Sequence, residues 1–187
     1  MELLKKIVWS SVRMLASVAV GFALLYGSIH RYQTISSQEY RYEHIQAIYH
    51  KLAVVTGRVN EVPPLLIIDQ PILNAFAMTN QVVLYQGLID FSKDDDEIAL
   101  VLGHEISHVL LGHLGKLQAT SVDEQAVLES MADKMGAMYM MRAGYNICTA
   151  REMWKRLAEQ YGDFLGGDHP NDAYRYEQLD VQCKVWW

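Results

Sequence analysis

The stretch of sequence that decides the fold reads DDDEIALVLGHEISHVLLGH and spans residues 94–113. Its four leading acidic residues are favourable at a helix N-terminus, because their charge offsets the positive end of the helix dipole. From Ile98 to Leu111 the residues are apolar on nearly every side of a helix, apart from four polar ones. Such a distribution indicates burial. We therefore predict a helix that begins near Ser92 and passes through the middle of a core.

The polar residues of this helix include an HExxH motif, formed by His104, Glu105 and His108. Because residues four apart lie on one face of a helix, the two imidazoles can bind one tetrahedral metal ion. Glu105 is adjacent to the first histidine and can instead take a proton from a metal-bound water. These side chains would be costly to bury unless a partner satisfied them, and zinc would do so. The alternative is a pair of core histidines hydrogen-bonded to the backbone without metal.

A catalytic zinc site needs a third protein ligand and keeps one position open for water. On a continuous helix His113 would point away from His104, so we predict that it caps the helix end or packs. Glu129 is the preferred third ligand, because it follows a break around residues 112–121 and opens a helix that can pack antiparallel to the first. Asp133, one turn later, can orient a ligating histidine. For both acidic residues a solvated helix face is the alternative.

The remaining segments predict a mainly helical α+β domain with a small sheet. Short runs rich in branched apolar residues predict strands at residues 65–68 and 81–85. Helical spacing and stop signals predict further helices, at residues 36–51, 122–143, 150–161 and 174–179.

The N-terminal segment differs in composition from the rest of the chain. Three basic residues lie within the first 13, and the stretch from Met14 to Ile29 contains no charged residue. We predict a membrane anchor within residues 1–30, followed by one domain at residues 31–187. A cleaved signal peptide and a buried core helix are the alternatives. The basic residues before the anchor predict that the domain lies on the non-cytoplasmic side, which is the periplasm in a bacterium.

Charge and cysteine content narrow the classes of partner. The formal net charge of −6 argues against nucleic-acid binding, which requires clustered lysine and arginine. Cys148 and Cys183 are the only cysteines and do not have metal-ligand spacing. They permit a disulfide but do not imply one.

Several of these motifs resemble the M48 family of gluzincin zinc peptidases. The resemblance rests on DEIALVLGHEISHVLLGH at residues 96–113 and ESMAD at residues 129–133. It extends upstream to LNAFA at residues 73–77 and VVLYQGL at residues 82–88. Downstream, His169-Pro170 with Arg175 matches the HPxxxxR element of that family.

The resemblance implies a zincin-like metallopeptidase fold with one Zn²⁺ per chain. The residues that it assigns to the metal centre are His104, Glu105, His108 and Glu129. It implies that Asp133 supports a ligating histidine. It also implies that His169 and Arg175 lie near the active site, where either can position a carboxylate or polarise the substrate carbonyl.

These observations predict a membrane-tethered zinc endopeptidase that hydrolyses peptide bonds in protein substrates. The family resemblance suggests misfolded or membrane-associated proteins as substrates. We expect an extended polypeptide to add to the edge of the strand at residues 81–85, and Glu105 to activate the attacking water. The alternative is a membrane-tethered, zinc-containing binding or chaperone-like module without turnover. A purely structural helical membrane protein would bind no metal.

Overall fold

The computed structural model describes residues 2–115, 121–161 and 172–186, with side chains for most of them from Ala19 onward. The chain divides into two units, residues 1–44 and 45–187. Helix α1 (Glu2–Val55) runs across this boundary. No helix of the described residues combines the length and the apolar character that a membrane span requires. All described residues predicted to act at a metal lie in the second unit.

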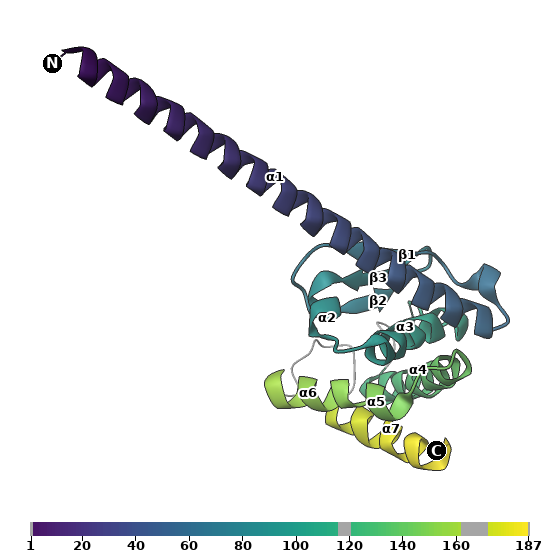
Figure 1. Cartoon of the computed structure of the whole chain (residues 1–187). Helices are drawn as coiled ribbons and strands as arrows, with labels where there is room; N and C mark the ends of the chain where they lie inside the picture. Colours follow the sequence, from purple (N-terminus) through teal and green to yellow (C-terminus); the bar gives the residue numbers. More distant parts are fainter. Residues whose placement is uncertain (1, 116–120, 162–171, 187) are drawn as a thin grey trace. The chain divides into compact units, whose positions relative to one another are not determined.

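The second unit is mainly helical and contains one small sheet, as predicted (Figure 1). Its strands are β1 (Leu65–Ile68), β2 (Ala75–Ala77) and β3 (Val82–Tyr85), preceded by the short 3-10 helix η1 (Val59–Glu61). Its helices after the sheet are α2 (Gln86–Phe91), α3 (Asp95–Leu110), α4 (Val122–Arg142), α5 (Ile147–Ala150), α6 (Glu152–Tyr161) and α7 (Asp172–Trp186). In Figure 1, α3 and α4 lie between the sheet and the pair formed by α6 and α7.

Most predicted elements are confirmed, with shifted ends. The predicted strands at residues 65–68 and 81–85 are β1 and β3. The helix predicted at residues 150–161 is divided into α5 and α6, and α7 is longer than the predicted residues 174–179. Helix α5 begins before the predicted residue 150, because the Asn146 side chain accepts a hydrogen bond from the Cys148 amide and caps the helix there.

Helix α3 begins slightly later than the sequence suggests. Its N-cap is Asp94, whose Oδ1 accepts a 3.0 Å hydrogen bond from the Glu97 amide. Ser92 instead donates its hydroxyl to the Leu88 carbonyl at the end of α2. From Glu97 to His108 every residue of α3 is buried, which confirms the prediction of a helix through the core.

The sheet has the strand order β1-β3-β2, so that β3 is central. β1 runs parallel to β3, with Leu65 opposite Val82, and β2 runs antiparallel to it, with Phe76 opposite Val83. The expectation that a substrate adds to the edge of the strand at residues 81–85 is therefore wrong, because β3 is paired on both sides. Of the two outer strands, β2 packs against α3.

Helices α3 and α4 approach closely at a pair of glycines. A Cβ atom on Gly103 would lie 2.9 Å from the Gly136 carbonyl oxygen, and one on Gly136 would lie 2.6 Å from the His104 amide nitrogen. Neither position has room for a side chain. Glu129 and Asp133 lie seven and three residues before Gly136 and share its helix face. The crossing therefore brings both carboxylates of α4 against the histidines of α3.

The two cysteines form a disulfide, a pairing that the sequence left open. Cys148 in α5 is bonded to Cys183 in α7. The bridge joins segments 35 residues apart in the sequence, and such a crosslink stabilises a fold by roughly 2–4 kcal/mol. It ties α7, which carries Arg175, to a helix that packs on α3.

The helix crossing predicts that Gly136→Ala destabilises the protein. Alanine favours a helix by about 1 kcal/mol over glycine, but here its methyl group would collide with the backbone of α3, so we expect a net loss of about 1–3 kcal/mol. Urea unfolding measures the difference. Lys134→Ala, on the exposed face of the same helix, is the matched control and should change stability little. A Gly136→Ala midpoint at or above that of the wild type would contradict the crossing.

Candidate metal centre

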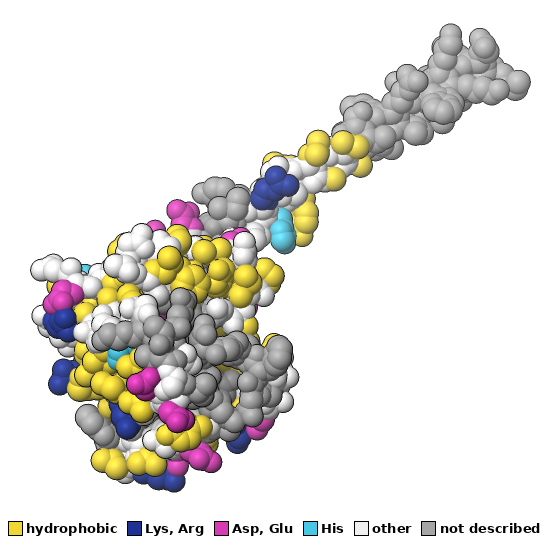
Figure 2. All heavy atoms as spheres, turned by 180° about the vertical axis from the view of Figure 1, so that it is seen from behind, with side chains coloured by type: hydrophobic (Ala, Val, Ile, Leu, Met, Phe, Trp, Pro, Cys, Tyr) yellow, Lys and Arg dark blue, Asp and Glu magenta, His cyan; other side chains and the backbone are white. Residues whose placement is uncertain are grey.

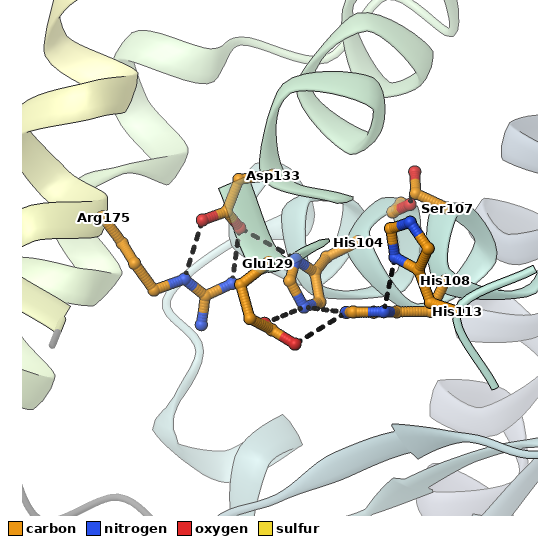
Figure 3. Close-up of polar contacts among 8 residues, drawn as sticks. His104, Ser107, His108, His113, Glu129, Asp133 and Arg175 are labelled. Carbon is orange, nitrogen blue, oxygen red and sulfur yellow. Dashed lines mark hydrogen bonds and ion pairs between the residues drawn. The ribbon is translucent and has the colours of Figure 1, made fainter. Parts of the chain in front are cut away.

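Three predicted metal ligands converge from two helices (Figure 3). The Nε2 atoms of His104 and His108, both on α3, lie 2.9 Å apart. From α4, the Glu129 carboxylate lies 3.3 Å from each of them, with Oε2 facing His104 and Oε1 facing His108. All three side chains are buried. They form a group whose ligand atoms lie within 4.8 Å of one another and could hold a metal ion.

The geometry and chemistry of this group fit zinc. Zinc is bound by imidazole nitrogen and carboxylate oxygen at about 2.0–2.2 Å, and a tetrahedron of such bonds has edges of about 3.3–3.6 Å. The three distances of 2.9, 3.3 and 3.3 Å approach that edge length. Without a cation or proton between them, the lone pairs of two imidazoles and a carboxylate would repel one another at such distances.

Asp133 and Arg175 lie behind His104 on the side away from the three converging atoms. The Asp133 Oδ1 atom lies 2.8 Å from the Nδ1 atom of His104. The Arg175 guanidinium, from α7, donates to both carboxylate oxygens, at 3.0 Å from Nε and 2.6 Å from Nη2. Because the carboxylate can only accept, His104 must donate from Nδ1. This hydrogen bond leaves the Nε2 atom of His104 directed toward Glu129.

Electrostatics of this buried group keep Asp133 ionised. Burial would raise the pKa of the Asp133 carboxyl, but the Arg175 guanidinium and His104 hold it well below its usual range. Burial and the Arg175 charge act to lower the pKa of His104, but the carboxylates of Asp133 and Glu129 outweigh them and raise it to about 9 without metal.

A tryptophan that carries no sequence signal completes the environment of Arg175. The guanidinium carbon of Arg175 lies 3.7 Å from the ring centroid of Trp154 in α6, a cation–π contact. Both side chains are buried. The guanidinium is thus held between an aromatic ring and the Asp133 carboxylate. Sequence reasoning missed Trp154, because it belongs to no motif and its partner lies on another helix.

Glu105 lies next to His104 on α3 and is 4% exposed. Its charge acts on Tyr49, a buried residue from the last part of α1: burial and the Glu105 carboxylate together raise the pKa of the Tyr49 phenol. Tyr49 donates its hydroxyl to the Pro63 carbonyl at 2.7 Å. Sequence reasoning did not single out this tyrosine.

The geometric expectation for His113 was wrong. His113 is 2% exposed, and its Nδ1 atom lies 3.2 Å from Nδ1 of His108. It points back toward the histidines because α3 ends at Leu110 and the chain reverses at Gly112, where φ is 67°. The group of described residues that could hold a metal does not include His113. His169, also predicted near the site, lies outside the described residues.

Comparisons with known proteins point to one family. Residues 39–128 match peptidase family M48. The mitochondrial metalloendopeptidase OMA1 of Arabidopsis thaliana is 26% identical over 146 residues, covering 61% of this chain and 30% of that protein. The human mitochondrial metalloendopeptidase OMA1 is 26% identical over 164 residues, covering 61% and 31%. The Escherichia coli (strain K12) metalloprotease LoiP is 40% identical over 65 residues, covering 34% and 25%.

The family match covers the part of the chain that carries the HExxH motif. The chain spans less than a third of the length of each of these relatives. The family match includes the sheet, all of α3 and the first turns of α4. Residues 39–128 of this chain thus resemble peptidase family M48, and the convergence of two α3 histidines with an α4 glutamate agrees with that match.

Proposed function

We propose that this protein is a zinc-dependent endopeptidase that hydrolyses peptide bonds in protein substrates. The observation that carries the proposal is the convergence of His104, His108 and Glu129 on one point, with Glu105 adjacent on the same helix. The match of residues 39–128 to a peptidase family supports it, as do the names of the relatives, which are metalloendopeptidases or metalloproteases.

In this proposal His104, His108 and Glu129 hold the zinc ion, one per chain. The ion would supply Lewis acidity, lowering the pKa of a water at its open position to about 7. Glu105 takes a proton from the attacking water and passes it to the leaving amine nitrogen. Asp133 orients His104, and Arg175 acts through Asp133. The location of His169 near the site stays a prediction from the family resemblance.

The outer edge of β2 is the proposed binding site for the substrate backbone. The Met78 amide donates to the Gln81 carbonyl and the Tyr85 amide donates to the Asn74 carbonyl, so even-numbered residues of β2 face β3. The peptide groups of Ala75 and Ala77 therefore face away from β3, toward an edge that no described strand covers. An extended peptide can pair with these groups beside α3 with little dependence on its sequence.

The assignment of Glu105 predicts that Glu105→Gln keeps zinc but loses turnover. Glutamine preserves the shape of the side chain but cannot accept a proton, so we expect casein cleavage to fall by about 10²-fold or more with one equivalent of zinc retained. Metal analysis and cleavage of casein by the full chain measure both quantities.

The wild-type chain is the control in this experiment. Retained cleavage by Glu105→Gln would refute the role of Glu105. Zinc in both proteins with cleavage in neither would refute the peptidase and favour a zinc-containing binding module, and absence of zinc from the wild type would refute the metal centre.

The proposed substrate edge predicts that Ala77→Pro impairs cleavage without unfolding the protein. Proline lacks the amide hydrogen that would bond to the substrate, and the β2–β3 ladder does not use that hydrogen. Loss of one such hydrogen bond should lower kcat/KM about tenfold. Ala77→Ser keeps the amide and should behave like the wild type. An unchanged kcat/KM for Ala77→Pro, with zinc content and urea midpoint also unchanged, would exclude this edge.

We also propose that residues 1–30 anchor the domain at residues 31–187 to a membrane, on its non-cytoplasmic side. Figure 2 shows hydrophobic side chains along the described part of α1. The large exposed ones before residue 31 are Val20, Phe22, Leu24, Leu25, Tyr26 and Ile29. The disulfide supports an oxidising compartment.

The anchor proposal predicts that the full chain stays with membranes after alkaline extraction and keeps its N-terminus, as measured by immunoblotting and N-terminal sequencing. A soluble protein that begins near residue 30 would show instead that the segment is a cleaved signal peptide.

A further inference from the structure

We propose that His113 is a positioning residue of the metal centre, whose imidazole accepts a hydrogen bond from His108 and holds that ligand in its binding tautomer and orientation. The inference rests on the proposed zinc centre and goes beyond its ligands. The observation is the 3.2 Å contact between the Nδ1 atoms of two buried histidines on either side of the end of α3 (Figure 3).

The backbone at the end of α3 brings His113 to this position. The amide of Gly112 donates to the Val109 carbonyl, and the amide of His113 donates to the His108 carbonyl at 3.0 Å. With Gly112 at a φ of 67°, this pair of hydrogen bonds is a Schellman motif, in which His113 and His108 are the two residues that meet. His108 and His113 are therefore joined twice. Their backbones are joined by the hydrogen bond that ends the helix, and their side chains are joined by the contact between the imidazoles.

The choice of histidine at this position is not explained by the helix stop. In Schellman motifs the side-chain contact between these two positions is usually apolar. A histidine that is 2% exposed is costly to bury unless its ring nitrogens are hydrogen-bonded. An apolar residue would therefore stabilise the helix end more. The side-chain hydrogen bond to His108 supplies a reason for an imidazole here.

The direction of this hydrogen bond follows from the chemistry of the ligand. If His108 gives the lone pair of Nε2 to a metal, its neutral ring must carry the hydrogen on Nδ1. His108 is then the donor and His113 the acceptor, with the hydrogen of His113 on Nε2. The ring planes, 70° apart, meet edge to face.

His113 thus plays for His108 the part that Asp133 plays for His104. Each ligating histidine has a buried acceptor at Nδ1, and such partners fix the ring and favour metal binding by the other nitrogen. The two acceptors differ in charge, because Asp133 is an anion balanced by Arg175 whereas an imidazole acceptor is neutral. His113 therefore orients its ligand without adding a second negative charge to the core.

The test compares the zinc affinity of two variants of the full chain. His113→Phe fills the space with a ring that accepts no such hydrogen bond, whereas His113→Asn places an amide oxygen near the position of Nδ1. We expect zinc to bind 10- to 100-fold more weakly to His113→Phe, and to His113→Asn within about threefold of the wild type. Competition with a chelator at fixed pH measures the dissociation constants, and the absorption spectrum of the cobalt-loaded proteins reports the ligand geometry.

Urea unfolding of the chelator-treated variants separates this role from a merely structural one. We expect the metal-free His113→Phe protein to unfold at a urea concentration equal to or above that of the wild type, so that only metal binding is impaired. Wild-type zinc affinity in His113→Phe, or an equal loss in His113→Asn, would overturn the role of His113. A wild-type chain that binds no zinc would instead overturn the metal centre itself.

A second measurement tests the hydrogen bond without relying on the folding of His113→Phe. Nitrogen NMR of histidine-labelled, zinc-loaded wild-type protein, assigned with His113→Asn, should show hydrogen on Nδ1 of His108 and on Nε2 of His113. A hydrogen on Nδ1 of His113 would overturn the proposed hydrogen bond.

Discussion

The rest of this structure depends on the close crossing of α3 and α4 at Gly103 and Gly136. Backbone atoms of one helix occupy the space that a side chain of the other would need. Because the two backbones approach so closely, the side chains one and two turns before Gly136 reach the histidines of α3 directly. Glu129 and Asp133 are those side chains, and their contacts with His104 are 3.3 and 2.8 Å long. A wider crossing would leave buried carboxylates and imidazoles apart, at a high cost in free energy.

Burial of the charged groups behind His104 is tolerated because they have partners of matching charge. Asp133 lies between His104 and Arg175, and Arg175 lies in turn against Trp154. These partners come from three helices beyond α3, and the disulfide holds one of them, α7, to α5. In a low-dielectric interior a half-satisfied network is worse than none, so the site and the packing of the C-terminal helices are coupled.

Much of the fold and of the candidate site could be predicted where the information is local. The HExxH spacing and the apolar surroundings of His104 and His108 predict a buried helix with two imidazoles on one face, and α3 has that form. The strand at residues 65–68 was equally clear from its branched residues. His113 was misjudged because a rotation angle counted along an unbroken helix loses its meaning beyond Gly112. Gly112 is a helix-stop signal, and the hydrogen-bond pattern of such a stop places the residue after the glycine against His108. The contact between His113 and His108 could have been predicted from it.

The sequence by itself determined the residue types and their spacing along each helix, because helical periodicity depends only on neighbours within a turn or two. It therefore predicted which side chains share a face. The break after the first helix favoured Glu129 as the third ligand but left a solvated helix face as the alternative. Only the tertiary structure decided that β3 is central and β2 is the open edge, that Cys148 pairs with Cys183, and that Trp154 packs on Arg175. These features depend on contacts between segments distant in the chain, and no local pattern of residues specifies which distant segment will be the neighbour.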